Sequence, residues 1–170
     1  MSDARWFDVE DDLASAIKHF DLSVRIFKEG VPPGDDLPAY KSRMALMQSM
    51  QSAYTSMERA YERILEILGE EKPTGSDYHA QLIKRVSRAF PESRPAIIEG
   101  ALAEAVDETR RFRHVARKGY DGFRVENAGA AIAAADYVRA HIREAIEVFR
   151  SVLEGADRER PEKDEGVAKS

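Results

Sequence analysis

The sequence predicts an all-α protein, an antiparallel bundle of four main helices plus a short helix. Apolar residues recur at alternating spacings of three and four positions along most of the chain, which is the period of one helix face. No stretch alternates strictly between apolar and polar residues, as a half-buried strand would. Residues 1–153 are expected to form one helical domain. Residues 154–170 are charged and poor in large apolar groups, so we expect a disordered tail there.

The first two helices are expected at residues 7–29 and 37–68, each followed by glycine and proline residues that end the pattern. The apolar stripe of the first consists of Leu13, Ile17, Phe20, Val24 and Phe27. That of the second consists of Met44, Met47, Tyr54, Met57, Tyr61, Ile64 and Leu68. Methionines at this spacing are typical of a helical core, so they do not indicate a cofactor site.

Three further helices follow. Ser76 or Asp77 can cap the short one, which carries Leu82, Ile83 and Val86. The next is expected to begin at Pro95, because proline is favoured in the first turn of a helix. Its buried stripe is Ile98, Leu102, Ala105, Thr109 and Phe112. The last spans residues 126–153 and buries Ile132, Val138, Ile142, Ala145, Phe149 and Val152.

The composition limits the classes of function. The chain has 170 residues, enough for one domain with a substantial core, and it contains no cysteine. A disulfide framework and a cysteine-based zinc or thiol site are therefore excluded. We expect no metal or other cofactor, and a first turn favoured by the helix dipole accounts for the acidic residues Asp8, Glu10, Asp11 and Asp12.

The distribution of charge and apolar residues bears on location and partners. The acidic start lacks the layout of a signal peptide, and no stretch approaches the ~20 apolar residues that span a bilayer. We therefore expect a cytoplasmic protein with no membrane partner. A net charge of −5 argues against non-specific coating of nucleic acid, but a local phosphate site remains compatible with it.

The basic segment 110–120, RRFRHVARKGY, places five cationic side chains within nine residues. Cations near the end of a helix are favoured by the helix dipole, so one interpretation is purely structural. Arginine presented beside histidine and tyrosine is also a common way of binding phosphate and cutting RNA. We expect Arg113 at the edge of the buried stripe, Arg117 one turn further, and His114 pointing away from the core. Lys118 and Tyr120 can turn back toward Arg113 where the helix unwinds.

The segment 102–123, with FRHVARKGYDGF at its centre, resembles the signature region of HepT-like proteins in the HEPN superfamily. The family motif has an arginine, often a polar residue after it, a histidine about five positions on, any residue, and a tyrosine. Arg113, His114 and Tyr120 match the motif, whereas Lys118 stands where the family has its histidine. The stretches SAYTSMERAYERIL, GSDYHAQLI and RPAII extend the resemblance to about residues 10–153.

This resemblance implies an all-helical toxin, usually a metal-independent endoribonuclease, paired with an MNT-type nucleotidyltransferase antitoxin. It also implies a homodimer whose two copies share one cleft. The RNA substrate, a tRNA or mRNA, would be cut by its own 2′-hydroxyl. Arg113 would hold the scissile phosphate, His114 and Lys118 would handle protons or charge, and Tyr120 would shape the site or be modified with nucleotide.

Further roles follow for the neighbouring residues. Arg110 and Arg117 would bind substrate. An imidazole with its ordinary pKa near 6.5 is a suitable base at neutral pH, whereas lysine is almost wholly protonated there. The other three histidines are expected to be structural, with His79 packing or capping at the start of a helix.

Two alternatives stay open at this point. The first is a degenerate HEPN module that binds or assembles without cutting RNA, favoured by the lysine at position 118. The second is a helical scaffold unrelated to RNA, for which the acidic net charge is the best argument.

Overall fold

The computed structural model describes residues 4–118 and 123–159, apart from the side chains of 117, 118 and 157–159. The helices are α1 (Ala4–Glu29), α2 (Leu37–Ile67), α3 (Tyr78–Val86), α4 (Gly100–Lys118) and α5 (Gly129–Glu159), with a 3₁₀ turn η1 (Val125–Ala128) before α5. These parts of the chain contain no strand, only an isolated bridge between Phe90 and Arg94. The all-α prediction is confirmed. None of these helices is long and apolar enough to cross a membrane.

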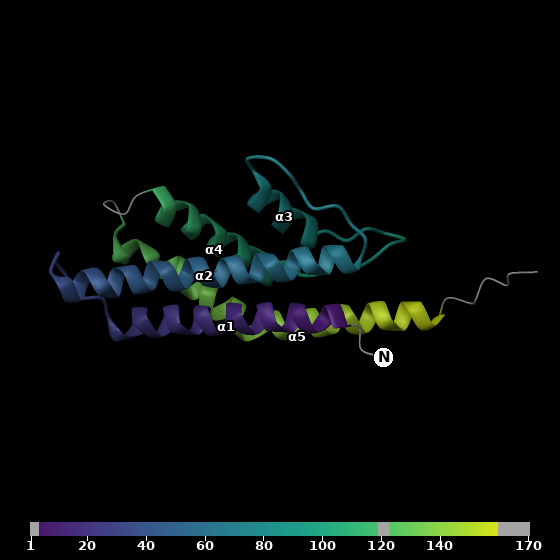
Figure 1. Ribbon diagram of the computed structural model, residues 1–170, viewed down its shortest axis with the longest axis horizontal. Coiled ribbons are helices and arrows are strands. Elements are labelled where there is room, and N and C mark those ends of the chain that lie inside the picture. Colours follow the sequence, from purple (N-terminus) through teal and green to yellow (C-terminus); the bar gives the residue numbers. More distant parts are fainter. Residues whose placement is uncertain (1–3, 119–122, 160–170) are drawn as a thin grey trace, which may run out of the picture.

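Three long helices, α1, α2 and α5, run side by side along the long axis of the molecule (Figure 1). Helix α4 packs on α5 and α2, and the short α3 lies over α2 next to α4. The face that carries α3 and α4 is therefore backed by the longest helices. Side chains from α2, α3 and α4 can meet there although they lie far apart in the sequence.

The core follows the predicted stripes with one error. Val152 was expected to be buried, but it is 49% exposed. The stripe of α5 passes through Ile142, Ile146 and Phe149 and then steps four residues to Leu153, which packs against the core. Because the spacing at this point is four residues instead of three, Val152 falls on the outer face.

Helix α4 begins at Gly100, five residues after the expected start. The backbone N–H groups of Ile97 and Ile98 donate to the Val86 carbonyl, at 2.8 and 3.3 Å. These bonds hold both isoleucines in the core in a non-helical segment, and Gly100 turns the chain with a φ of +54°. The prediction that Pro95 starts the helix was therefore wrong, since tertiary docking of the isoleucines overrides the local proline signal.

Arg94 anchors this connection. Its side chain is 1% exposed, and its guanidinium is ion-paired with Glu70 in the loop after α2. The same guanidinium donates to the carbonyls of Arg85, Arg88 and Pro95 at 3.0–3.3 Å. One buried cation thus ties the segments before and after α3 to each other.

The other helix ends differ slightly from expectation. Asp77 occupies the N-cap position of α3 but makes no capping hydrogen bond, and its carboxylate accepts instead from the Gln81 amide at 2.8 Å. The final helix starts as a 3₁₀ turn and becomes α-helical at Gly129. It continues to Glu159, into the segment where we expected a tail, and residues 160–170 lie outside the described residues.

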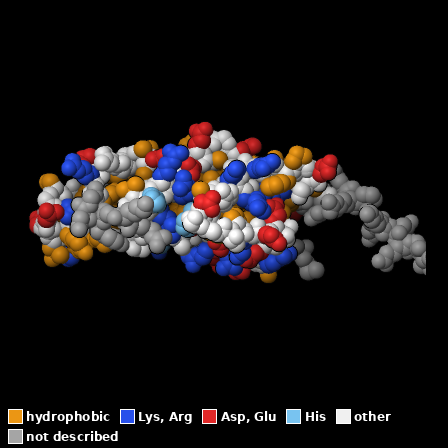
Figure 2. Space-filling model, turned by 90° about the horizontal axis from the view of Figure 1, so that it is seen from above, with side chains coloured by type: hydrophobic (Ala, Val, Ile, Leu, Met, Phe, Trp, Pro, Cys, Tyr) orange, Lys and Arg blue, Asp and Glu red, His pale blue; other side chains and the backbone are white. Residues whose placement is uncertain are grey.

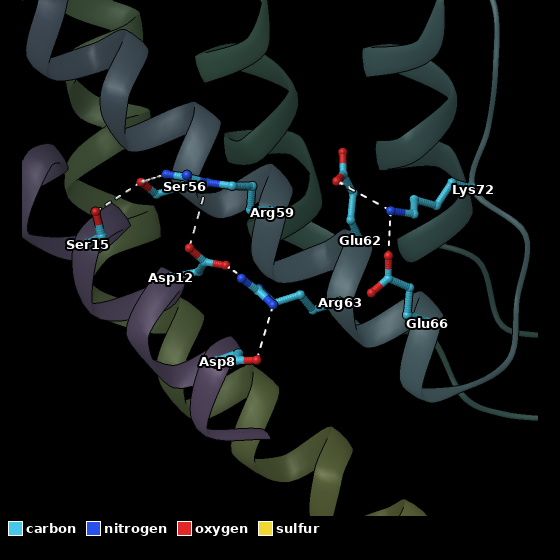
Figure 3. Close-up of polar contacts among 9 residues, drawn as sticks. All are labelled: Asp8, Asp12, Ser15, Ser56, Arg59, Glu62, Arg63, Glu66 and Lys72. Carbon is cyan, nitrogen blue, oxygen red and sulfur yellow. Dashed lines mark hydrogen bonds and ion pairs between the residues drawn. The ribbon is translucent and has the colours of Figure 1, made fainter. Parts of the chain in front are cut away.

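Polar contacts fix α1 against α2 (Figure 3). Arg63 Nε donates to Asp12 Oδ2 at 2.7 Å, and its Nη1 reaches Asp8 at 3.2 Å. Ser15 and Ser56 share a hydrogen bond of 3.0 Å between the same two helices. The acidic start of α1 is therefore partly neutralised by α2, and the described residues contain no group of acids and histidines suited to hold a metal ion.

A second set of contacts in Figure 3 joins the loop after α2 to that helix. Lys72 Nζ lies 2.5 Å from a Glu66 carboxylate oxygen and 3.8 Å from Glu62. Glu62 also accepts a hydrogen bond from the hydroxyl of Tyr78, the first residue of α3. The start of α3 is thus tied to α2 at one position.

Candidate active site

The structure places the expected site residues of α4 in different surroundings. Arg113 is half-buried, whereas His114 is exposed and has no hydrogen bond to another residue in the described ranges. Arg110 Nε donates to Asp107 at 2.7 Å, and Arg111 reaches the other oxygen of that carboxylate at 2.8 Å. The side chains of Arg117 and Lys118, and Tyr120 as a whole, lie outside the described part of the chain.

The pairing of Arg110 affects its predicted role. Burial would raise the pKa of Asp107, but the two arginines outweigh it and hold that pKa below its usual range. Asp107 is therefore charged at neutral pH and occupies part of the donor capacity of Arg110. A substrate phosphate would have to compete with this carboxylate for Arg110.

Arg113 reaches across to a different helix. Its Nη1 lies 2.9 Å from Nε2 of His79, in the first turn of α3. The other ring nitrogen of His79, Nδ1, is hydrogen-bonded to Oε1 of Glu58 on α2. Three helices therefore contribute to one array of carboxylate, imidazole and guanidinium, which we call the Glu58–His79–Arg113 array.

The array fixes the tautomer of the histidine. A guanidinium can only donate hydrogen bonds, so Nε2 of His79 must accept with its lone pair. The ring proton then sits on Nδ1 and is donated to Glu58. In this state the imidazole is neutral, and its basic nitrogen faces Arg113.

The family comparison bears on this region. A family model described as HepT-like protein matches residues 45–153, about two thirds of the chain. The chain belongs to the HepT-like family. No curated protein and no solved structure gives a significant match. All three residues of the Glu58–His79–Arg113 array lie within the matched range of this HepT-like protein.

Local spacing explains why α3 presents His79 to Glu58. Glu58 and Glu62 are four residues apart on α2, so both carboxylates lie on one face of that helix. Glu62 accepts a hydrogen bond from the Tyr78 hydroxyl, and Glu58 is hydrogen-bonded to the adjacent His79. The rings of Tyr78 and His79 also meet edge to face with centroids 5.5 Å apart. Two neighbouring carboxylates thus hold the first turn of α3.

Tyr54 packs against the array. Its ring is 1% exposed, lies under the Arg113 guanidinium at 5.8 Å, and meets the His79 ring edge-on at 6.2 Å. Burial, and then the nearby Glu58 charge, raise the pKa of the Tyr54 hydroxyl well above its usual value. Tyr54 therefore stays protonated and supplies a rigid aromatic surface for Arg113.

Glu58 carries the electrostatic cost of the site. Its side chain is 9% exposed, and burial raises its pKa, while His79 and Arg113 act in the opposite direction. Keeping this carboxylate charged thus destabilises the folded protein, and its two partners offset the loss of hydration only in part. A buried carboxylate against a histidine that is 33% exposed is an arrangement suited to orienting an imidazole for proton transfer.

Sequence reasoning did not single out Glu58, and it placed His79 at a helix start, where the residue packs, without predicting its contact with Arg113. One signal was present in α2: Tyr54, Glu58, Tyr61 and Leu65 follow a 4-3-4 spacing and are all buried. A single carboxylate inside an apolar stripe indicates a buried partner. The partner, His79, could not be identified, because nothing local relates residue 58 to residue 79.

Proposed function

We propose that this HepT-like protein is the RNA-cleaving toxin of a toxin–antitoxin pair and a metal-independent endoribonuclease. The Glu58–His79–Arg113 array is the observation that supports this proposal. The motif arginine has an imidazole beside it, although Lys118 stands at the histidine position of the motif. In this proposal His79 takes over the role of the missing histidine.

The chemistry requires one proton to leave the 2′-hydroxyl and another to reach the leaving oxygen. Nε2 of His79 accepts the 2′-hydroxyl proton, and the 2′-oxygen attacks the adjacent phosphorus. The bond to the 5′-oxygen breaks, and Lys118 donates a proton to that oxygen. The products are a 2′,3′-cyclic phosphate and a free 5′-hydroxyl. Glu58 stabilises the imidazolium, as a buried carboxylate does in a catalytic triad.

Arg113 has two tasks in this scheme. In the free protein it donates to Nε2 of His79 and so occupies the base. A phosphate oxygen is a stronger acceptor for a guanidinium than a neutral ring nitrogen, because the hydrogen bond is then ionic on both sides. Binding of the scissile phosphate withdraws the Arg113 donor and leaves Nε2 available to the 2′-hydroxyl.

The family supports the remaining assignments. We propose a homodimer, an MNT-type nucleotidyltransferase as antitoxin, and Tyr120 as the residue that shapes the site or receives a nucleotide from that partner. Arg110 and Arg117 are proposed to bind the flanking phosphates. His114 is the alternative base on the same helix as Arg113, and variants of the two histidines separate these assignments.

A second candidate function has one specific observation in its favour. Lys118 stands where the family has its histidine, and loss of that histidine is the change expected in a HEPN module that binds RNA or a partner without cutting RNA. Purified protein incubated with tRNA and total RNA in excess chelator distinguishes the two functions. Cleavage with 2′,3′-cyclic phosphate ends supports the nuclease, whereas intact RNA together with retained partner binding supports the degenerate module.

A further inference from the structure

A basic groove lies on the face of α3 turned away from the Glu58–His79–Arg113 array. It is lined by residues of the loop before α3 and by Gln81, Lys84, Arg85, Arg88 and Phe90. On a helix, positions 81, 84 and 85 lie well over 100° around the axis from position 79. The groove therefore does not continue the proposed cleavage site but opens on a separate surface of α3.

The cations of this groove are only partly compensated. Arg85 lies 3.8 Å from a Glu70 carboxylate oxygen and donates to the Glu71 carbonyl at 3.1 Å. Lys84 and Arg88 are exposed, and neither has an acidic partner among the residues that the structure describes. The acid in the lining, Asp77, accepts from the Gln81 amide. Two positive charges are thus available to a ligand.

The arrangement of these two cations suits a polyanion. Helix α3 ends at Val86, and Ser87 still has right-handed backbone angles, so Arg88 lies about one turn beyond Lys84. The half-buried Phe90 ring lies beside two guanidinium groups, that of the buried Arg94 at 4.8 Å and that of Arg88 at 5.7 Å from the ring centroid. Cations that follow one another beside an aromatic ring are the elements with which proteins hold single-stranded nucleic acid without reading its sequence.

We propose that the α3 groove anchors the backbone of single-stranded RNA at a distance from the cleavage site. This inference rests on the proposed ribonuclease function, because it takes RNA as the ligand. The face that carries α3 is shown in Figure 2, where Lys and Arg side chains are interspersed with acidic ones. The binding energy of such a site is the same before and during the chemical step, so it lowers KM and leaves kcat unchanged.

The test uses the double variant Lys84→Gln/Arg88→Gln. Its matched control is Lys18→Gln/Lys28→Gln, which removes the same charge from exposed positions on α1. Binding of a fluorescent single-stranded RNA is measured by anisotropy over a series of salt concentrations. Both pairs are compared in a His79→Asn background, so that the RNA stays intact during the measurement.

We expect the groove variant to bind more weakly and its slope of log K against log salt to become shallower by about 1.4, or 0.7 for each lost phosphate contact. The control pair should keep the slope of its parent. In the protein with His79, the groove variant should raise KM for RNA cleavage at unchanged kcat. An unchanged slope with normal cleavage overturns the groove while the ribonuclease stands. A shallower slope of the groove variant, together with no RNA cleavage by the protein that keeps His79, supports the groove and overturns the ribonuclease.

Discussion

Arg113 Nη1 donates to His79 Nε2 across 2.9 Å, joining two residues that are 34 positions apart in the sequence. The contact couples α4, which carries the motif arginine, to the first turn of α3. Because Glu58 holds the other ring nitrogen, the imidazole is fixed between a carboxylate and a guanidinium.

Arg113→Ala should lower kcat for RNA cleavage by about 10²–10³-fold, the usual cost of losing one donor to a developing oxyanion. Its guanidinium lies at the edge of the core, so the bundle should stay folded, as judged by circular dichroism. Arg111→Ala is the matched control, because Arg111 is 64% exposed and pairs only with Asp107 and Glu108 among the described residues. Equal activity in both variants would show that Arg113 does not contact the phosphate.

Glu58→Gln should separate stability from activity. Burial raises the pKa of Glu58, so the folded protein binds a proton at this residue more tightly than the unfolded chain does. The wild type therefore loses stability relative to Glu58→Gln as pH rises from the ordinary glutamate range through the raised pKa. Urea unfolding of both proteins at several pH values measures this difference.

At the same time Glu58→Gln should reduce RNA cleavage, because a neutral amide stabilises the imidazolium less than a carboxylate does. Its matched control is Glu66→Gln, an exposed acid on the same helix that pairs with Lys72. If the stability difference between Glu58→Gln and the wild type does not change with pH, the two partners of Glu58 compensate fully for its burial.

Arg94→Ala should lower the free energy of unfolding by about 3 kcal/mol, since it leaves the partly buried Glu70 carboxylate without its main partner. It also removes three hydrogen bonds to backbone carbonyls around α3. Chemical denaturation measures the loss. Arg88→Ala, an exposed arginine nearby, should change stability by less than about 0.5 kcal/mol.

The homodimer prediction concerns the whole molecule. Light scattering should give a mass near twice 19.1 kDa, since the family resemblance implies two copies around one cleft. A mass of 19.1 kDa at all concentrations tested would show a monomer and would contradict the homodimer with its shared cleft.

The sequence was sufficient to predict the helices, because their apolar periodicity survives in the fold: Phe20, Tyr61 and Ile142 are all buried as expected. It did not predict the start of α4, where hydrogen bonds to the Val86 carbonyl hold a segment that proline alone would have made helical. Local rules describe helix interiors well. Helix ends depend on tertiary contacts that no local pattern contains.

The candidate site was only half visible in the sequence. Arg113 could be recognised from its motif and from its place at the edge of a buried stripe. The contact of His79 with Arg113 could not be predicted, because it depends on how α3 packs against α2 and α4. Contacts between side chains on different helices can be predicted only once the fold is known.

The most direct measurement is the rate of RNA cleavage in excess chelator by His79→Asn and His114→Asn, side by side with the wild type. Asparagine can keep a polar group near the position of Nδ1 but has no atom at the position of Nε2, so it removes the base at either position. If His79 is the base, His79→Asn should lose about 10²–10⁴-fold in kcat, and His114→Asn should keep most of its activity. Full activity in His79→Asn, or the loss appearing in His114→Asn instead, would contradict the assignment of the Glu58–His79–Arg113 array as the catalytic site.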